Sequence, residues 1–228
     1  MIEPFTETKV KEYSSFDELK EKQAENQRKS LARTRKMVNL YSRCWRWEWF
    51  VTFTFNPSKI DRTDFQTCMK KIRNWLQNAR QKIAPNMKYL IVPELHSDMV
   101  SWHLHGLLAD VGDMCFTNSG KKVDKQAIYN ISNWKWGFST ATKVQDTYRV
   151  QKYITKYITK ESHALSFGAH RYYVSNNLPK PKQSTMLIEP QEQSEVIEQI
   201  ANSLGLDIVW ISNTYSTPYT NVTYIELQ

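Results

Sequence analysis

Residues 87–109 have the sequence MKYLIVPELHSDMVSWHLHGLLA, and this stretch decides the fold. It contains two runs rich in β-branched, aromatic and aliphatic residues, at 87–95 and 102–109, which predict two strands. The polar turn around Ser97 and Asp98 lies between them, so the two runs predict a β-hairpin. The sheet built around this hairpin is therefore expected to be antiparallel.

The segments on both sides of the hairpin predict further strands and helices. The chain order of these elements predicts an α+β fold, with an antiparallel five-stranded sheet and flanking helices. Upstream, we expect a polar helix at 14–38, a strand at 50–55 and an amphipathic helix at 61–84 that Pro85 closes. Downstream, we expect a short helix at 124–131, a strand at 134–144, a helix from Asp146 to about His163 and a strand at 167–174.

Composition and charge divide the chain into three parts. It has 228 residues, enough for one large domain or for one domain with an appendage. Of its 23 acidic residues, six lie in 189–228, which has no Lys or Arg and predicts one helix and two short strands. The remaining 17 acids and all 31 basic residues give 1–188 a net charge of +14. We therefore expect a basic N-terminal extension (1–47), a catalytic domain (48–188) and an acidic C-terminal addition (189–228).

Several classes of protein are excluded by the sequence. No apolar run reaches the roughly 20 residues of a membrane span, and the first residues lack the pattern of a signal peptide. The three cysteines lie far apart, which indicates neither a zinc site nor a disulfide framework. No phosphate-binding loop of the G-x-x-x-x-G-K-[ST] type is present. We therefore expect an intracellular protein without membrane partners.

The hairpin carries a candidate metal site. His103 and His105 are two residues apart on one strand, so both project from the same face. If the chain turns about Asp98 and Met99, Glu94 lies opposite His103, with Cβ atoms roughly 4.5–5.5 Å apart. Two imidazoles and a carboxylate suit a divalent cation with open positions. The alternative is an exposed strand face that carries histidines without a ligand.

A repeated tetrapeptide in 153–160 (YITKYITK) provides candidate catalytic residues. At 100° per residue, Tyr153, Lys156, Tyr157 and Lys160 fall on one stripe of the expected helix. A phenol is a weak nucleophile at its ordinary pKa of about 10, and a nearby cation would lower that pKa. The alternative is an amphipathic helix whose tyrosines only pack on the sheet.

Two basic stretches are candidate nucleic-acid contacts. Basic residues interleaved with aromatic ones suit a surface that binds phosphates and stacks bases. A solvated helix that leads into a core strand would have the same composition. The candidates are Arg33, Arg35, Lys36, Arg43 and Arg46 in the first stretch, and Arg171, Lys180 and Lys182 in the second.

Three of these motifs, in this order, resemble those of the HUH endonuclease superfamily, in particular rolling-circle replication initiators of phages and plasmids. They are the Thr/Phe strand at 50–55, Glu94 followed by His-Leu-His at 103–105, and the doubled tyrosine at 153–160. The resemblance covers 48–182 and implies a ferredoxin-like palm, similar to that of RNA recognition motifs. It also implies Mg²⁺ or Mn²⁺ and a tyrosine that forms a 5′-phosphotyrosyl link to single-stranded DNA.

The resemblance further implies a role at a replication origin in the cytoplasm of a bacterial host. Because no helicase domain is attached, unwinding would need a host helicase, and the free 3′-OH would serve a polymerase. Tyr157, with Lys160 after it, is similar to the tyrosine of single-tyrosine initiators, so we expect it to make the first cut. Tyr153 would then accept the strand in a second transfer.

Two other readings remain open. A transposase or a conjugative relaxase would use the same chemistry on a different DNA. A non-catalytic α+β module could bind nucleic acid through aromatic and basic residues alone. Such a module would be indifferent to EDTA, because it needs no cluster of Glu94, His103 and His105.

Overall fold

The computed structural model describes residues 16–158, 169–182, 193–212, 215–216, 221–222 and 225–227. The chain divides into two compact units, Met1–Pro181 and Lys182–Gln228, and each is described by itself. Among the described residues, no helix combines the length and the apolar character needed to cross a membrane.

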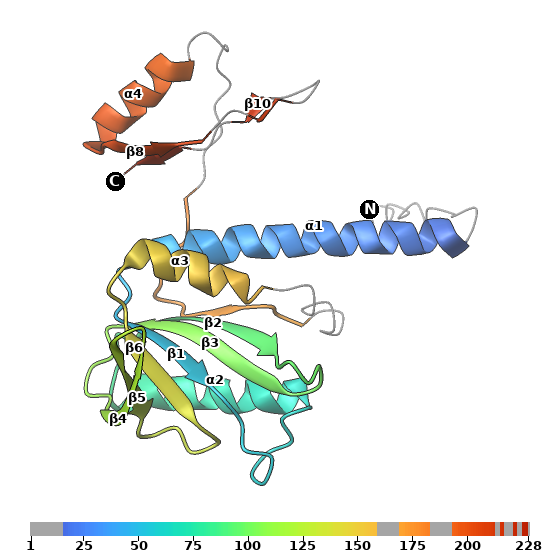
Figure 1. Cartoon of the computed structure of the whole chain (residues 1–228), viewed down its shortest axis with the longest axis vertical. Coiled ribbons are helices and arrows are strands. Elements are labelled where there is room, and N and C mark those ends of the chain that lie inside the picture. The colour runs from blue at the N-terminus through green and yellow to red at the C-terminus, as the bar shows by residue number, and fades with distance from the viewer. Residues whose placement is uncertain are drawn as a thin grey trace, which may run out of the picture. The chain divides into compact units, whose positions relative to one another are not determined.

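The first unit is built on one antiparallel sheet (Figure 1). Within the described residues the sheet has seven strands, in the order β4-β5-β6-β1-β3-β2-β7. The fold class is therefore α+β, as predicted. The strands are β1 (Trp49–Phe53), β2 (Lys88–Leu95), β3 (Trp102–Ala109), β4 (Phe116–Val123), β5 (Gln126–Ile131), β6 (Ser139–Lys143) and β7 (Tyr173–Val174).

One face of the sheet is covered by α2 (Phe65–Lys82) (Figure 1). The Asp64 side chain caps this helix by accepting a hydrogen bond from the Gln66 N–H. Apolar residues recur along α2 at helical spacing, and with alternate residues of the strands they form the larger core. At its centre Phe53 contacts Trp75 and Trp134, with ring centroids 5.0 and 4.8 Å away.

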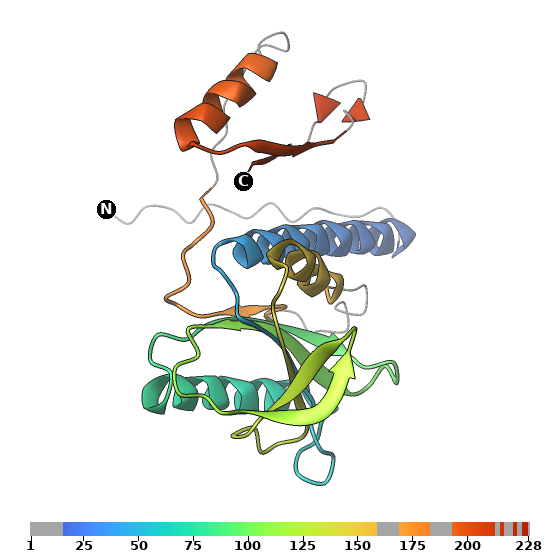
Figure 2. The same ribbon diagram turned by 60° about the vertical axis from the view of Figure 1, so that its left-hand side comes forward.

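The opposite face is partly covered by α1 (Phe16–Arg43) and α3 (Thr147–Lys156) (Figures 1 and 2). These helices lie over β2 and β3 and enclose a second, smaller core. As the helical spacing predicted, α3 buries Val150, Ile154 and Ile158 against the sheet. Asp146 caps α3 as predicted, by accepting a hydrogen bond from the Arg149 N–H.

The hairpin of β2 and β3 has the predicted register. Glu94 pairs with His103 and Val92 pairs with His105. The turn is stabilised by Asp98, whose Oδ1 accepts hydrogen bonds from the backbone N–H groups of Val100 and Ser101. This register places Glu94, His103 and His105 on the face that α1 and α3 only partly cover.

The short helix expected at 124–131 is wrong. That segment forms β5, which pairs with β4 in a hairpin that adds two strands to the five expected. Asp124 and Lys125 form its turn with positive φ angles of 46° and 67°, the combination that a two-residue hairpin loop requires. Tertiary packing fixes the strand, because the ring of Tyr129 meets that of Trp49 edge-on at 5.3 Å.

Other boundaries differ from the predictions by a few residues. β6 is shorter than the strand expected at 134–144, and only two residues of the strand expected at 167–174 pair with β2. The regular part of α3 ends at Lys156, with Tyr157 as its C-cap, whereas we expected the helix to reach His163. Residues 159–168, including Lys160, lie outside the described residues.

The second unit contains α4 (Gln193–Leu204), β8 (Ile208–Ile211), β9 (Tyr215–Ser216), β10 (Asn221–Val222) and β11 (Ile225–Leu227). β8 pairs with β11, and β9 pairs with β10. The expected helix and two strands are thus found, with a further pair of short strands. The division of the chain into three domains at residues 47 and 188 remains a prediction.

Candidate active site

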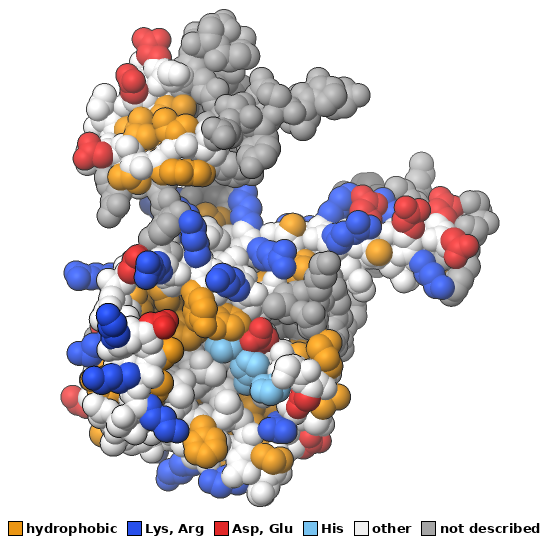
Figure 3. All heavy atoms as spheres, viewed as in Figure 1, with side chains coloured by type: hydrophobic (Ala, Val, Ile, Leu, Met, Phe, Trp, Pro, Cys, Tyr) orange, Lys and Arg blue, Asp and Glu red, His pale blue; other side chains and the backbone are white. Residues whose placement is uncertain are grey.

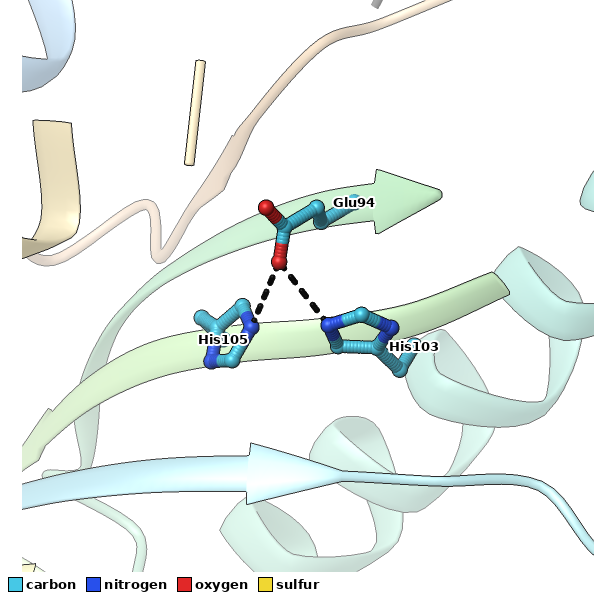
Figure 4. Close-up of side chains that lie close together, drawn as sticks. All are labelled: Glu94, His103 and His105. Carbon is cyan, nitrogen blue, oxygen red and sulfur yellow. Dashed lines mark hydrogen bonds and ion pairs between the residues drawn. The ribbon is translucent and has the colours of Figure 1, made fainter. Parts of the chain in front are cut away.

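Glu94, His103 and His105 converge on one point above the sheet (Figure 4). The Nε2 atoms of His103 and His105 lie 2.8 and 2.9 Å from the same carboxylate oxygen of Glu94. One ligand atom from each residue can be chosen so that all three lie within 4.8 Å of one another. Two imidazole nitrogens and a carboxylate oxygen therefore fit one divalent cation, as the sequence predicted.

The environment fixes the orientation of the ring of His105. Its Nδ1 lies 3.1 Å from the hydroxyl of Thr52, which is the residue opposite His105 on β1. With Nε2 on an ion, Nδ1–H would donate to this hydroxyl, an arrangement common among metal-binding histidines. Nδ1 of His103 is buried and has no hydrogen-bond partner among the described residues.

The ionisation states in the cluster favour ligand binding. Burial acts to raise the pKa of the Glu94 carboxyl, but hydrogen bonds with the two imidazoles outweigh burial and hold that pKa at about 2. Burial lowers the pKa of His105 below its ordinary value. An ionised carboxylate and a neutral imidazole are the forms that bind metal ions.

The tyrosine helix lies directly beside this cluster. The ring of Tyr157 stacks on that of His105, with centroids 3.4 Å apart and planes inclined by 15°. The ring of Tyr153 meets Tyr157 edge-on at 5.2 Å, and it is 45% exposed. Phe50 touches all three rings from β1, at 5.9 Å from His105, 5.1 Å from Tyr153 and 6.1 Å from Tyr157.

The expectation that flanking lysines lower the pKa of the phenol is wrong for Tyr157. Burial, hydrogen bonding with Tyr153 and the negative charge of Glu94 raise the pKa of Tyr157 above its ordinary value. Lys156 instead lies over the ring of Tyr153, with its Nζ 5.6 Å from the centroid. The predicted role of Lys160 concerns a residue outside the described part of the chain.

The basic candidates separate into two groups. Two of them make contacts within the protein: Arg35 Nε donates to the backbone oxygen of Ile158 at 2.8 Å, and Arg171 donates to the hydroxyl of Ser30 at 2.6 Å. The first contact joins α1 to the residue after Tyr157. The side chains in the second group are exposed: Arg33, Lys36, Arg43, Arg46, Lys180 and Lys182.

Phe50 and Thr52 are site residues that sequence reasoning missed. The strand at 50–55 was interpreted through its buried side, namely Val51, Phe53 and Phe55. Because side chains alternate along a strand, Phe50 and Thr52 must face the opposite side. Pairing of β1 with β3 brings that side to the histidines. The alternation was visible in the sequence, but the pairing of these two strands was not.

The fold and the site together define an α+β protein with a candidate metal-binding cluster next to a tyrosine-bearing helix. The family model of the replication-associated protein ORF2 matches residues 48–162, just over half of the chain. The protein therefore belongs to this family of replication-associated proteins. No curated protein and no solved structure matches the chain.

Proposed function

We propose that the protein is an HUH-type nickase and strand transferase that initiates rolling-circle replication. The stacking of Tyr157 on His105 carries this proposal, because it brings a phenol to the edge of a cluster that suits a divalent cation. Membership in a replication-associated family supports DNA at an origin as the substrate. A host helicase and a polymerase would complete the reaction sequence.

In this mechanism Glu94, His103 and His105 hold the ion, for which Mg²⁺ and Mn²⁺ are the candidates. When bound, the ion supplies positive charge that polarises a phosphodiester and favours the ionised form of a nearby phenol. Thr52 and Phe50 keep His105 in place by a hydrogen bond and a ring contact. The raised pKa of Tyr157 in the absence of an ion means that the phenol is held neutral until the site is loaded.

The covalent step joins Tyr157 to DNA. Its hydroxyl loses a proton, and the oxygen attacks the phosphorus. The bond between phosphorus and the 3′ oxygen breaks, and that oxygen takes up a proton. The products are a 5′-phosphotyrosine and a free 3′-OH. Tyr153 is one helical turn away and more exposed, so it is placed to accept the strand in a second transfer.

Adduct formation tests the proposal. The protein is incubated with Mn²⁺ and with random-sequence and hairpin-forming single-stranded DNA, and SDS-stable protein–DNA adducts are measured. We expect adducts with the unaltered protein and with Tyr153→Phe, but none with Tyr157→Phe, with His105→Ala or in EDTA. The phenylalanine variants keep the rings and remove only the hydroxyls.

Binding of DNA and of Mn²⁺ provides the controls. His105→Ala should still bind single-stranded DNA, because binding depends on the distributed basic surface. Calorimetry should show loss of Mn²⁺ binding in His105→Ala and retention in Tyr157→Phe. Adducts in Tyr157→Phe that vanish in Tyr153→Phe would reverse the order of the tyrosines. Undiminished adducts in EDTA, or in the double Tyr→Phe variant, would overturn the mechanism.

A further inference from the structure

Phe138 is the most exposed large hydrophobic side chain among the described residues. It is 82% exposed, although its neighbour Ser139 is 5% exposed. Phe138 directly precedes β6, whose residues alternate between the core of α2 and the opposite face. Thr140 of β6 lies opposite Thr52, and Thr52 contacts His105. Two residues from Thr140, Phe138 therefore belongs to the face that carries the histidines.

The position of Phe138 relative to the site follows from strand geometry. β6 is separated from β3 by β1 alone, and neighbouring strands are about 4.8 Å apart. Two strand spacings sideways and two residues along the strand place the Phe138 backbone roughly 12 Å from that of His105. A DNA strand has one phosphate per about 3.4 Å in a duplex, so this span is only a few nucleotides.

The backbone of Phe138 is held firmly although its ring is exposed. Its carbonyl oxygen accepts hydrogen bonds from the Thr54 N–H at 2.9 Å and the Thr54 hydroxyl at 3.1 Å. Its own N–H lies 3.1 Å from the same hydroxyl. Gly137 makes this close approach possible, because a Cβ there would collide with the carbonyl oxygen of Thr54. A rigid backbone presents the ring at little cost in backbone entropy.

Positive charge surrounds the same loop. Lys59 Nζ donates to the backbone oxygen of Lys135 at 2.9 Å, which places two lysines three residues or fewer from the ring along the loop. Lys71 Nζ lies over the ring of Trp136 at 4.1 Å from its centroid. Figure 3 shows Lys and Arg side chains spread over this face around the pale-blue histidines. An exposed aromatic ring among lysines is the combination with which proteins bind single-stranded nucleic acid.

We propose that Phe138 is a base-stacking subsite for single-stranded DNA, a few nucleotides from the scissile phosphate. The lysines around it contact the backbone phosphates, and the ring stacks on one base without reading its identity. The inference rests on the proposed function for its substrate. It adds a positioning residue, because a base held at Phe138 fixes how far the strand extends toward His105 and Tyr157.

The test is a two-by-two binding cycle. Tyr157→Phe serves as the background and EDTA is present, so that no cleavage occurs. One ligand is an oligothymidylate, and the other is the same backbone with abasic positions throughout. Phe138→Ala should weaken binding of the oligothymidylate about 5- to 150-fold, the equivalent of 1–3 kcal/mol per stacked base. It should leave binding of the abasic strand unchanged.

Variants separate stacking from general effects. Phe138→Trp should retain tight binding of the oligothymidylate, whereas Phe138→Leu, which keeps apolar volume without a flat ring, should lose it. Trp210→Ala is the matched control, since Trp210 is also an exposed ring, 51% exposed, in the acidic unit. It should not alter binding. Circular dichroism confirms that every variant is folded.

Equal losses on both ligands, or none on either, would overturn the stacking subsite. Failure of the proposed function is recognised separately in the adduct assay. A protein that forms adducts but shows no coupling between ring and base keeps the function and loses the subsite. A protein that shows the coupling but never forms adducts keeps the subsite as part of a binding module.

Discussion

The docking of α3 on the sheet can be tested quantitatively, because Ile154 is fully buried between them. Ile154→Ala removes about three methylene equivalents, or roughly 2.4 kcal/mol at 0.8 kcal/mol each. The cavity left behind brings the expected cost to about 2–5 kcal/mol. A helix of ten residues is not stable alone, so much of this cost should fall on the docking of α3.

Ile72→Ala is the matched control. Ile72 is 1% exposed and lies on α2, which packs on the opposite face of the sheet. Urea denaturation should give similar losses in the free energy of unfolding for the two variants. At a temperature where both remain folded, only Ile154→Ala should lose hydrogen-exchange protection in α3 and form the tyrosine adduct more slowly.

Two results would refute this reasoning. If the α3 amides of Ile154→Ala stay as protected as those of Ile72→Ala, the helix does not depend on this contact. If α3 loses protection but the adduct forms at the unaltered rate, docking of the helix does not limit the reaction. The exchange measurement does not depend on the proposed chemistry, so the structural part can be judged alone.

Three further predictions concern capping, cysteine reactivity and salt. Asp146→Ala should destabilise α3 by about 0.5–2 kcal/mol, visible as faster amide exchange, and Asp146→Ser should restore most of the loss. Burial first, and nearby acidic charges second, raise the pKa of Cys68 to about 12, so a thiol reagent at pH 8 should label the exposed Cys115 and leave Cys68 intact until urea unfolds the protein; labelling of Cys68 in the folded protein would contradict its burial. Neutralising Arg33 and Lys36 together should reduce the slope of log K for single-stranded DNA against log salt by about 1.4, at roughly 0.7 per phosphate, and an unchanged slope would mean that these side chains are only solvated.

The metal cluster was predictable because it depends on local rules. A hairpin register follows from the position of its turn, and strand alternation then fixes which side chains share a face. The pairing of Glu94 with His103 was therefore derivable before the fold was known. The cap at Asp146 and the buried face of α3 were equally local.

The contacts that were not predicted depend on tertiary structure. The stack of Tyr157 on His105 requires α3 to lie over β3, and nothing in either segment specifies that placement. The raised pKa of Tyr157 follows from the same burial. The hairpin of β4 and β5 was missed because its turn has no glycine or asparagine, and Asp124 and Lys125 adopt positive φ angles without one.

The hydrogen bond from Arg35 to the oxygen of Ile158 connects two segments that are 123 residues apart. It makes the basic helix and the tyrosine helix parts of one thermodynamic system. Any ligand that binds α1 more tightly when α3 is docked must stabilise the docked state by the same free energy, since such coupling is reciprocal. A phosphate backbone gripped at α1 would thus act as an effector of the tyrosines, and the enzyme would be most ordered when its substrate is present.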